Sequence, residues 1–168
     1  MTAAPSVGRL IGIARRGAVR APMQELTEGT ITVEGGLAGD HKGPKFPRRR
    51  ITVLAIEDWH AALAALGDAD GRPLDLPWTA RRANLLVAGL RLPRARGGVL
   101  RIGPVRLEIT NPTQPCRRMD EVRQGLLKAL HPAWRGGVTC AVLAGGVVAI
   151  GDEAEVLHAP PEVTARLP

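Results

Sequence analysis

The stretch Val-Leu-Arg-Ile-Gly-Pro-Val-Arg-Leu-Glu-Ile-Thr, at residues 99–110, predicts a β-hairpin. Apolar residues alternate with charged ones on both sides of the Gly103-Pro104 turn, which is the period-two pattern of strands that bury one face and expose the other. The second strand leads directly into Asn111-Pro112. We therefore expect the next segment to be a loop at a strand end, where a rigid scaffold often carries functional groups.

That loop contains Cys116, which is followed directly by Arg117 and Arg118. Neighbouring fixed positive charge favours the thiolate, the form that attacks electrophiles or binds metals. A free cysteine is also among the most buried residue types, so the local residues leave a purely structural role open. Cys140 lies in an alternating apolar strand without a charged neighbour, and it is predicted to be a core residue.

Short apolar runs separated by glycine and proline recur along the chain and predict a mainly β fold. A helix is expected at 57–66, where apolar residues recur at helical spacing, and another at 120–130, which Pro132 ends. Many short strands with only a few short helices favour a single-domain β-barrel over residues 1–168, with flexible termini. The other expected strands are 9–14, 29–33, 51–55, 138–143, 147–150 and 155–157.

The composition bounds the class of protein. With 168 residues, 45% of them hydrophobic, the chain has enough material for one domain with a core. Its two cysteines lack the spacing of a disulfide framework. The longest apolar run, 138–150, is interrupted by glycine and is shorter than the roughly 20 residues of a membrane span. Residues 1–20 lack the apolar core of a signal peptide. We expect a cytoplasmic protein with no membrane partner.

The formal net charge is +7, and the basic residues are twenty arginines and only three lysines. A guanidinium binds phosphate and carboxylate through paired hydrogen bonds, so this excess favours an anionic partner; a high genomic GC content is the alternative source of arginine. The arginines concentrate at 48–50, 81–82 and 117–118. Only four aromatic residues are present, which disfavours the stacking platforms of proteins that bind single-stranded nucleic acid or RNA.

The sequence lacks the residues that several other kinds of functional site require. Ser6 is the only serine, which argues against a Ser-His-Asp hydrolase. No glycine-rich segment fits a P-loop or a dinucleotide fingerprint. The four histidines are scattered singly, unlike the clustered ligands of a structural zinc site.

Five sequence elements, in order, resemble those of the MOSC domain, a family named for the C-terminal part of molybdenum cofactor sulfurase. The resemblance covers about residues 8–158. The first element is similar to the family's glycine-rich Gly-Asp-x-His segment, and the second to its Arg-x-Asn element. The elements are 35–41 with the strand 50–54 after it, Arg82-Ala83-Asn84-Leu85, 100–103, Pro115-Cys116, and 135–142 with the glycine turns 145–146 and 151–152.

The resemblance implies a β-barrel that binds molybdenum cofactor, a pterin dithiolene carrying molybdenum and a terminal phosphate. It places Cys116 as the molybdenum ligand and as a catalytic residue, and a soft thiolate suits a metal already bound by sulfur. Arg82 and Asn84 would contact the cofactor, although from its neighbours alone Asn84 is better explained by a turn-satisfying amide, and Arg82 could be a surface charge. Further cofactor contacts are expected at Arg50, Arg117 and Gly136.

Asp40 and His41 have two interpretations, an acid and base pair that takes part in catalysis or a hydrogen-bonded brace of the loop.

Two residues depart from what relatives offer. Gln114 stands before Pro115, where some cofactor-bound relatives have a small hydroxyl residue, and Lys42 follows His41 at a position that varies.

By the same resemblance, the expected function is the reduction of N-hydroxylated compounds by a molybdenum-dependent oxidoreductase. The chain has no flavin, haem or iron–sulfur motif, so electrons are expected from a separate reductase partner. No pyridoxal phosphate is expected, because the chain has no room for the separate domain that binds it in sulfurases. Two alternatives stay open: a carrier of sulfur or of the cofactor without turnover, served by a cofactor-delivery protein, and a basic β-barrel that binds nucleic acid.

Overall fold

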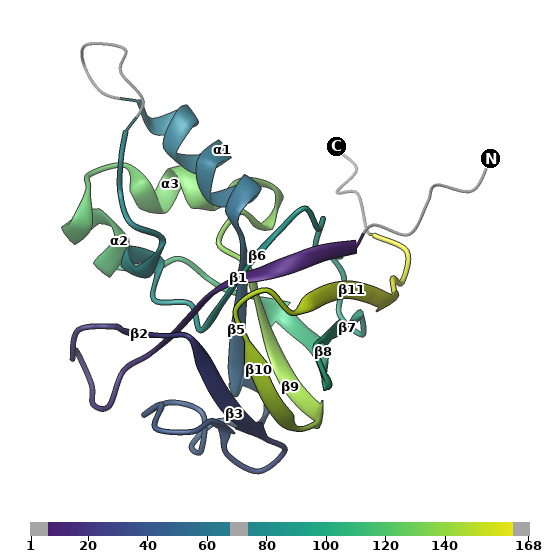
Figure 1. Cartoon of the computed structure of the whole chain (residues 1–168). Coiled ribbons are helices and arrows are strands. Elements are labelled where there is room, and N and C mark those ends of the chain that lie inside the picture. Colours follow the sequence, from purple (N-terminus) through teal and green to yellow (C-terminus); the bar gives the residue numbers. More distant parts are fainter. Residues whose placement is uncertain (1–6, 68–73, 163–168) are drawn as a thin grey trace.

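Seven strands close into a barrel in the computed structural model, which describes residues 7–67 and 74–162 (Figure 1). Pairing of the last strand with the first, Glu155 opposite Val7, closes the ring. The strands around the ring are β1 (Val7–Arg15), β6 (Leu85–Ala88), β5 (Ile51–Ala55), β9 (Val138–Ala144), β8 (Val105–Pro112), β7 (Val99–Ile102) and β11 (Glu153–His158). The predicted mainly β barrel is therefore confirmed.

Apolar side chains at alternate positions of the strands fill the barrel interior. In β8, Val105, Leu107 and Ile109 are fully buried, and the charged residues between them are exposed or half-buried. β7 and β8 pair as the expected hairpin. Cys140 on β9 is fully buried in the same core, as predicted, and burial raises the pKa of its thiol. All five residues of β5 are buried. Ile51, Val53 and Ala55 lie in the barrel core, and on the other face Leu54 packs against the helices and Thr52 contacts Asn84.

A smaller sheet of β10 (Gly146–Ala149), β3 (Glu28–Thr32) and β4 (Gly36–Leu37) accompanies the barrel, and β2 (Gln24–Leu26) pairs with β1. Glycine is needed where β4 passes the start of β5. Gly36 has a φ of +71°, and a Cβ there would lie 2.8 Å from the carbonyl oxygen of Arg50. This close passage brings the glycine-rich segment 35–41 against the end of the short helix η1 (Pro47–Arg49).

The helices gather beside one end of the barrel (Figure 1). They are α1 (Ile56–Leu66), α2 (Arg117–Val122) and α3 (Leu126–Leu130), with the 3₁₀ turns η2 (Trp78–Arg81) and η3 (Pro132–Trp134). Trp59 of α1, Met119 of α2 and Leu126 of α3 are buried in a second apolar cluster with Leu54 and Leu86 of the barrel wall. In the described part of the chain, no helix is long and apolar enough to cross a membrane.

The expected single helix at 120–130 is wrong, because two helices with a break occupy this stretch. Arg123 is extended, with a φ of −155°, and Gly125 has a φ of +92°. The carboxylate of Asp120 accepts hydrogen bonds from the backbone N–H groups of Gly125 and Leu127, at 3.1 and 3.0 Å. The side chain thereby supplies an acceptor to two backbone N–H groups at the start of α3, where intrahelical acceptors are lacking. The strands β2, β4 and β6 are further elements absent from the sequence prediction.

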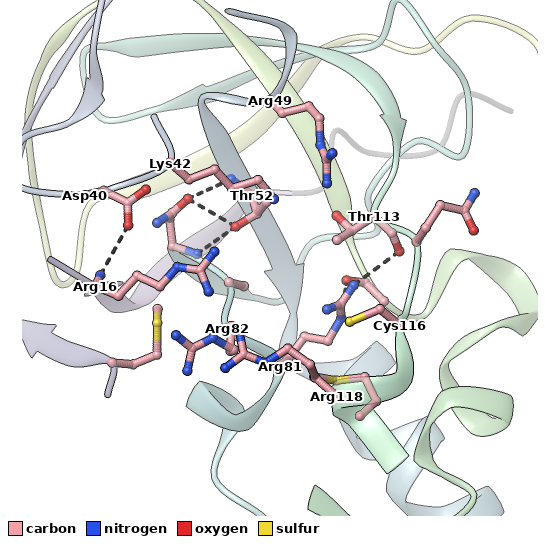
Figure 2. A pocket seen from close by; sticks show the side chains of 16 residues that line it. Arg16, Asp40, Lys42, Arg49, Thr52, Arg81, Arg82, Thr113, Cys116 and Arg118 are labelled. Carbon is pink, nitrogen blue, oxygen red and sulfur yellow. Dashed lines mark hydrogen bonds between the residues drawn. The ribbon is translucent and has the colours of Figure 1, made fainter. Parts of the chain in front are cut away.

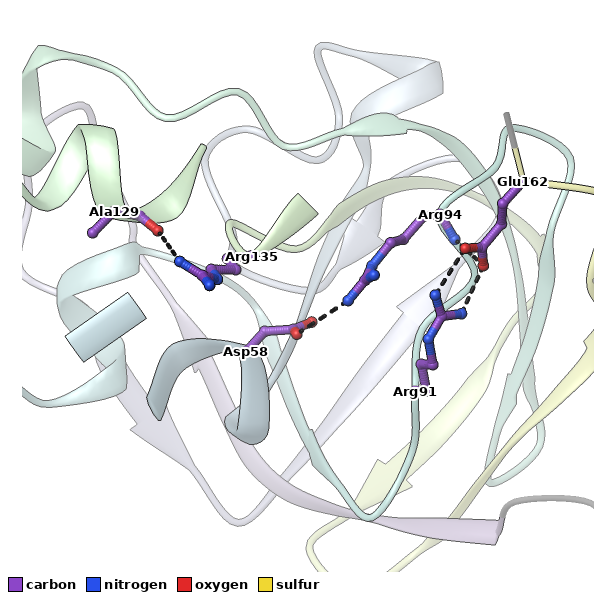
Figure 3. Close-up of polar contacts among 6 residues, drawn as sticks. All are labelled: Asp58, Arg91, Arg94, Ala129, Arg135 and Glu162. Carbon is purple, nitrogen blue, oxygen red and sulfur yellow. Dashed lines mark hydrogen bonds and ion pairs between the residues drawn. The ribbon is translucent and has the colours of Figure 1, made fainter. Parts of the chain in front are cut away.

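Ion pairs hold the segment after β11 against the connection between β6 and β7 (Figure 3). Arg91 donates to both carboxylate oxygens of Glu162, at 2.6 and 2.8 Å, and these bonds lower the pKa of Glu162 to about 2. The guanidinium of Arg94 faces Asp58 at 3.9 Å, and burial raises the pKa of that carboxyl group. These surface arginines therefore have carboxylate partners.

Candidate functional site

The three arginine-rich stretches of the sequence meet at one pocket on the barrel (Figure 2). Its volume is about 180 Å³, smaller than the roughly 300–1,000 Å³ of pockets that enclose a whole ligand. A cofactor-sized group would therefore extend out of it toward solvent. The pocket is lined by Arg16, Met23, Asp40, Lys42, Arg49, Thr52, Arg81, Arg82, Ala83, Asn84, Thr113, Gln114, Cys116, Arg118, Met119 and Gly136.

The lining is strongly cationic, with six basic side chains and one carboxylate, that of Asp40. Arg91, Arg94 and Arg101 form ion pairs elsewhere, whereas within residues 7–67 and 74–162 no carboxylate pairs with a basic side chain of the pocket. Concentrated positive charge in a concave surface raises the local concentration of anions. The arrangement therefore suits an anionic ligand with several oxygen acceptors.

Cys116 lies at the end of the loop that follows β8. The N–H of Thr113 donates to the carbonyl of Gly137 at 2.9 Å, and the carbonyl of Cys116 accepts from the N–H of Met119 in the first turn of α2. The residue is exposed and lines the pocket, on the side away from Arg16 and Asp40 (Figure 2). The predicted delivery of Cys116 by a strand end is confirmed.

Arg81 stabilises residues 113–116 between β8 and α2, which we call the cysteine loop. Its side chain is buried, and it donates to the carbonyl oxygens of Gly136 at 3.0 Å and Thr113 at 3.2 Å. Burial lowers the pKa of this guanidinium to about 10, against the opposing effect of the nearby Cys116. A Cβ at position 136 would lie 3.1 Å from a guanidinium nitrogen of Arg81. Gly136 therefore shapes the pocket by leaving space for Arg81.

Arg82 has a left-handed backbone, with a φ of 65°. One guanidinium nitrogen donates to the carbonyl of Ala21 at 2.7 Å. Its Nε is buried and has no hydrogen-bond partner among residues 7–67 and 74–162, and the same is true of the hydroxyl of Thr113, which also lines the pocket. Buried polar groups are nearly always satisfied in native proteins. These two groups are therefore candidates to bind a ligand.

Asn84 holds three parts of the barrel wall together. Its side-chain oxygen accepts from the N–H of Thr52 at 3.0 Å and from the Thr52 hydroxyl at 3.1 Å, and its side-chain nitrogen donates to the carbonyl of Ala14 at 3.2 Å. The residue is 5% exposed and lines the pocket. These bonds favour the structural interpretation of Asn84, and they leave one amide hydrogen for a ligand.

The loop after β4 is braced by its own side chains. The Asp40 carboxylate accepts from the backbone N–H groups of Arg16 at 3.2 Å and Gly43 at 3.3 Å. Arg50 donates to the carbonyl of Gly43 at 2.7 Å. The ring of His41 contacts the ammonium of Lys45, at 3.2 Å. These contacts favour the brace over the acid and base pair.

Five of the eight predicted site residues line the pocket: Cys116, Asp40, Arg82, Asn84 and Gly136. His41, Arg50 and Arg117 do not line it, and Arg117 is exposed at the start of α2. The structure adds Arg16, Lys42, Arg49, Arg81 and Arg118. Three of these additions, Arg49, Arg81 and Arg118, come from the arginine clusters of the sequence. Which arginine of each cluster faces the pocket depends on the local backbone geometry. In the sequence, Lys42 stood out only as a departure from relatives after His41, and Arg16 carried no signal.

Replacing Thr113 by valine is expected to leave the free energy of unfolding within about 1 kcal/mol of wild type, because the hydroxyl has no partner to lose among the residues that the structure describes. Thr110 is the matched control, since its buried hydroxyl contacts the carbonyls of Arg48 and Thr139. Thr110→Val is expected to cost about 1–3 kcal/mol. Urea unfolding of both variants measures the difference, and equal losses would show that Thr113 is satisfied in the protein alone.

Comparisons with known proteins agree with this architecture. The family model of the MOSC domain matches residues 40–155. The solved structure of the YuaD protein from Bacillus subtilis superposes with a TM-score of 0.67 at 21% identity, covering 91% of this chain and 97% of that one. YiiM from Escherichia coli gives a TM-score of 0.66 at 19% identity, over 93% of this chain and 73% of that one. At these identities the two structures show the fold alone.

A comparison with curated proteins finds no match. The family model covers well over half of the chain and includes the pocket residues from Asp40 to Gly136. The chain therefore belongs to the MOSC domain family, which is associated with molybdenum cofactor.

Proposed function

We propose that the pocket beside Cys116 binds molybdenum cofactor through its anionic and pterin groups. Three features of the chain fit that group. Within the part of the chain that the structure describes, the basic lining lacks carboxylate partners, and the buried Nε of Arg82 and the hydroxyl of Thr113 have no hydrogen-bond partner. Cys116 offers a soft sulfur ligand. The observation that carries the proposal is the convergence of unpaired cations and an accessible cysteine in one pocket.

Each type of side chain would have its own task. Cys116 would be the protein ligand of molybdenum. The guanidiniums of Arg82 and Arg118 would bind oxygen atoms of the phosphate or a pterin carbonyl, since their planar donors suit both. The free amide hydrogen of Asn84 would donate to the pterin edge. Arg81 would act through another residue, because its bonds to Thr113 and Gly136 position the cysteine loop.

The proposed reaction is the reduction of an N-hydroxylated compound to the corresponding amine or amidine. The nitrogen–oxygen bond breaks, two electrons and two protons enter, and the oxygen leaves as water. When bound, the molybdenum centre supplies the two-electron redox chemistry, and the protein supplies orientation and a positively charged pocket. The electrons would come from a separate reductase in the cytoplasm, a reducing compartment that suits the two free cysteines.

The reaction is tested with protein purified from a host that makes the cofactor and, as control, from a host that cannot. Reduced benzyl viologen supplies the electrons, and a hydroxylaminopurine and an amidoxime are the substrates. We expect amine or amidine formation with the loaded protein, at least about tenfold above the cofactor-free control. A loaded protein that turns over neither substrate would favour the carrier function over the reductase.

A further inference from the structure

Lys42 is the one lysine of the pocket, and it lies among arginines (Figure 2). It belongs to the loop after β4, on the side of the pocket that Asp40 braces. The side chain is half-buried. In the described ranges 7–67 and 74–162, no ion pair engages its ammonium group. The nitrogen is therefore available to a ligand in the pocket.

Charged groups from every adjoining element act on this ammonium. Arg49 of η1, Arg16 after β1 and Arg81 of η2 are positive and disfavour its proton, and Asp40 of its own loop favours it. Burial and then these three arginines, in that order, lower the pKa of Lys42 to about 8. A lysine with this pKa changes its charge just above neutral pH, whereas an ordinary lysine does so near 10.4.

Other titratable groups near Lys42 are less suited to change the charge of the pocket just above neutral pH. His41 contacts Lys45 and does not line the pocket. The Asp40 carboxylate already accepts two backbone hydrogen bonds. Burial lowers the pKa of Arg81 only to about 10, so this guanidinium keeps its charge where Lys42 titrates. Arg16, Arg82 and Arg118 are further arginines of the lining.

We propose that Lys42 makes oxyanion binding in this pocket dependent on pH, because its ammonium form binds the anion and its neutral form does not. The proposal rests on the proposed function only for the identity of the natural ligand. The ligand class it names is a phosphate-like oxyanion, since such an anion accepts hydrogen bonds from an ammonium and from guanidiniums at once.

The sign of the linkage follows from the charges. A bound dianion favours the ammonium form and raises the pKa of Lys42 in the complex. At a pH between the two values, the free protein is partly deprotonated and the complex is protonated, so binding takes up a proton. Affinity is therefore highest below pH 8 and falls as the pH rises above the pKa of the free protein, which is about 8.

The test uses sulfate, which stays a dianion throughout this range and so adds no titration of its own. Isothermal titration calorimetry at pH 8.5, in buffers of different ionisation enthalpy, measures proton uptake directly. The variants are Lys42→Arg and Lys42→Met, with Lys45→Arg as the control on the same loop. Affinity at pH 7.5 and 9.5 completes the comparison.

For wild type and Lys45→Arg we expect partial proton uptake and an affinity that falls about 25-fold between the two pH values, because the protonated fraction of a lysine with a pKa of about 8 falls by that factor. Lys42→Arg should bind sulfate at both pH values with no proton uptake, and Lys42→Met should bind weakly at both. Unchanged proton uptake in Lys42→Arg, or no sulfate binding by wild type, would overturn the proposal. Molybdenum content is measured separately, so proton-linked sulfate binding without molybdenum would refute the cofactor and leave the role of Lys42 standing.

Discussion

Replacing Asn84 by alanine is expected to lower the free energy of unfolding by about 3 kcal/mol, one of the two largest effects we predict. The substitution removes the acceptor of the Thr52 N–H and the donor to the Ala14 carbonyl, and both groups lie in a buried part of the barrel wall. A buried polar group left without a partner costs about 1–3 kcal/mol. Two such groups account for the expected loss, and the Thr52 hydroxyl also loses its acceptor while it still accepts from the backbone N–H of residue 84.

Urea denaturation of the cofactor-free protein measures this effect without any contribution from a ligand. Asn111→Ala is the matched control, because the Asn111 side chain accepts one exposed bond from Arg96, and it is expected to cost less than about 1 kcal/mol. If Asn84→Ala were as stable as wild type and yet lost bound molybdenum, Asn84 would be a ligand contact rather than a structural amide.

The barrel was predictable because its signals are local. The alternation at 99–110 and the apolar run of β5 follow directly from the burial of one face or of both. The helix break at 123–125 was not predictable in this way. It depends on which backbone groups the Asp120 carboxylate contacts, and hydrophobic periodicity carries no information about such bonds.

The sequence predicted which arginine clusters form the site, but it did not predict which contacts each arginine makes. The sequence placed arginines beside Cys116 and in two other stretches, and the fold brings Arg49, Arg81 and Arg118 from those stretches to one pocket. It did not distinguish the buried Arg81 from the partly exposed Arg82, although the two neighbours have different tasks. The 3₁₀ turn ending at Arg81 and the left-handed backbone of Arg82 decide this difference.

Replacing Cys116 by serine is expected to reduce bound molybdenum at least about tenfold, the other large effect. A serine oxygen is a harder and more weakly donating ligand than a thiolate, and it suits a sulfur-bound metal poorly. The side chain is exposed, so the substitution should leave the fold intact. Cys140→Ala is the control, because it removes the other thiol from within the barrel core, away from the pocket.

The most direct test of the account is the molybdenum and pterin content of wild type, Cys116→Ser and Cys140→Ala, purified in parallel from a host that makes the cofactor. Elemental analysis measures the metal, and fluorescence after oxidation measures the pterin. We predict nearly one molybdenum and one pterin per chain in wild type and Cys140→Ala, and loss of the metal in Cys116→Ser. Absence of both from all three proteins, or equal metal in all three, would contradict a molybdenum site at Cys116.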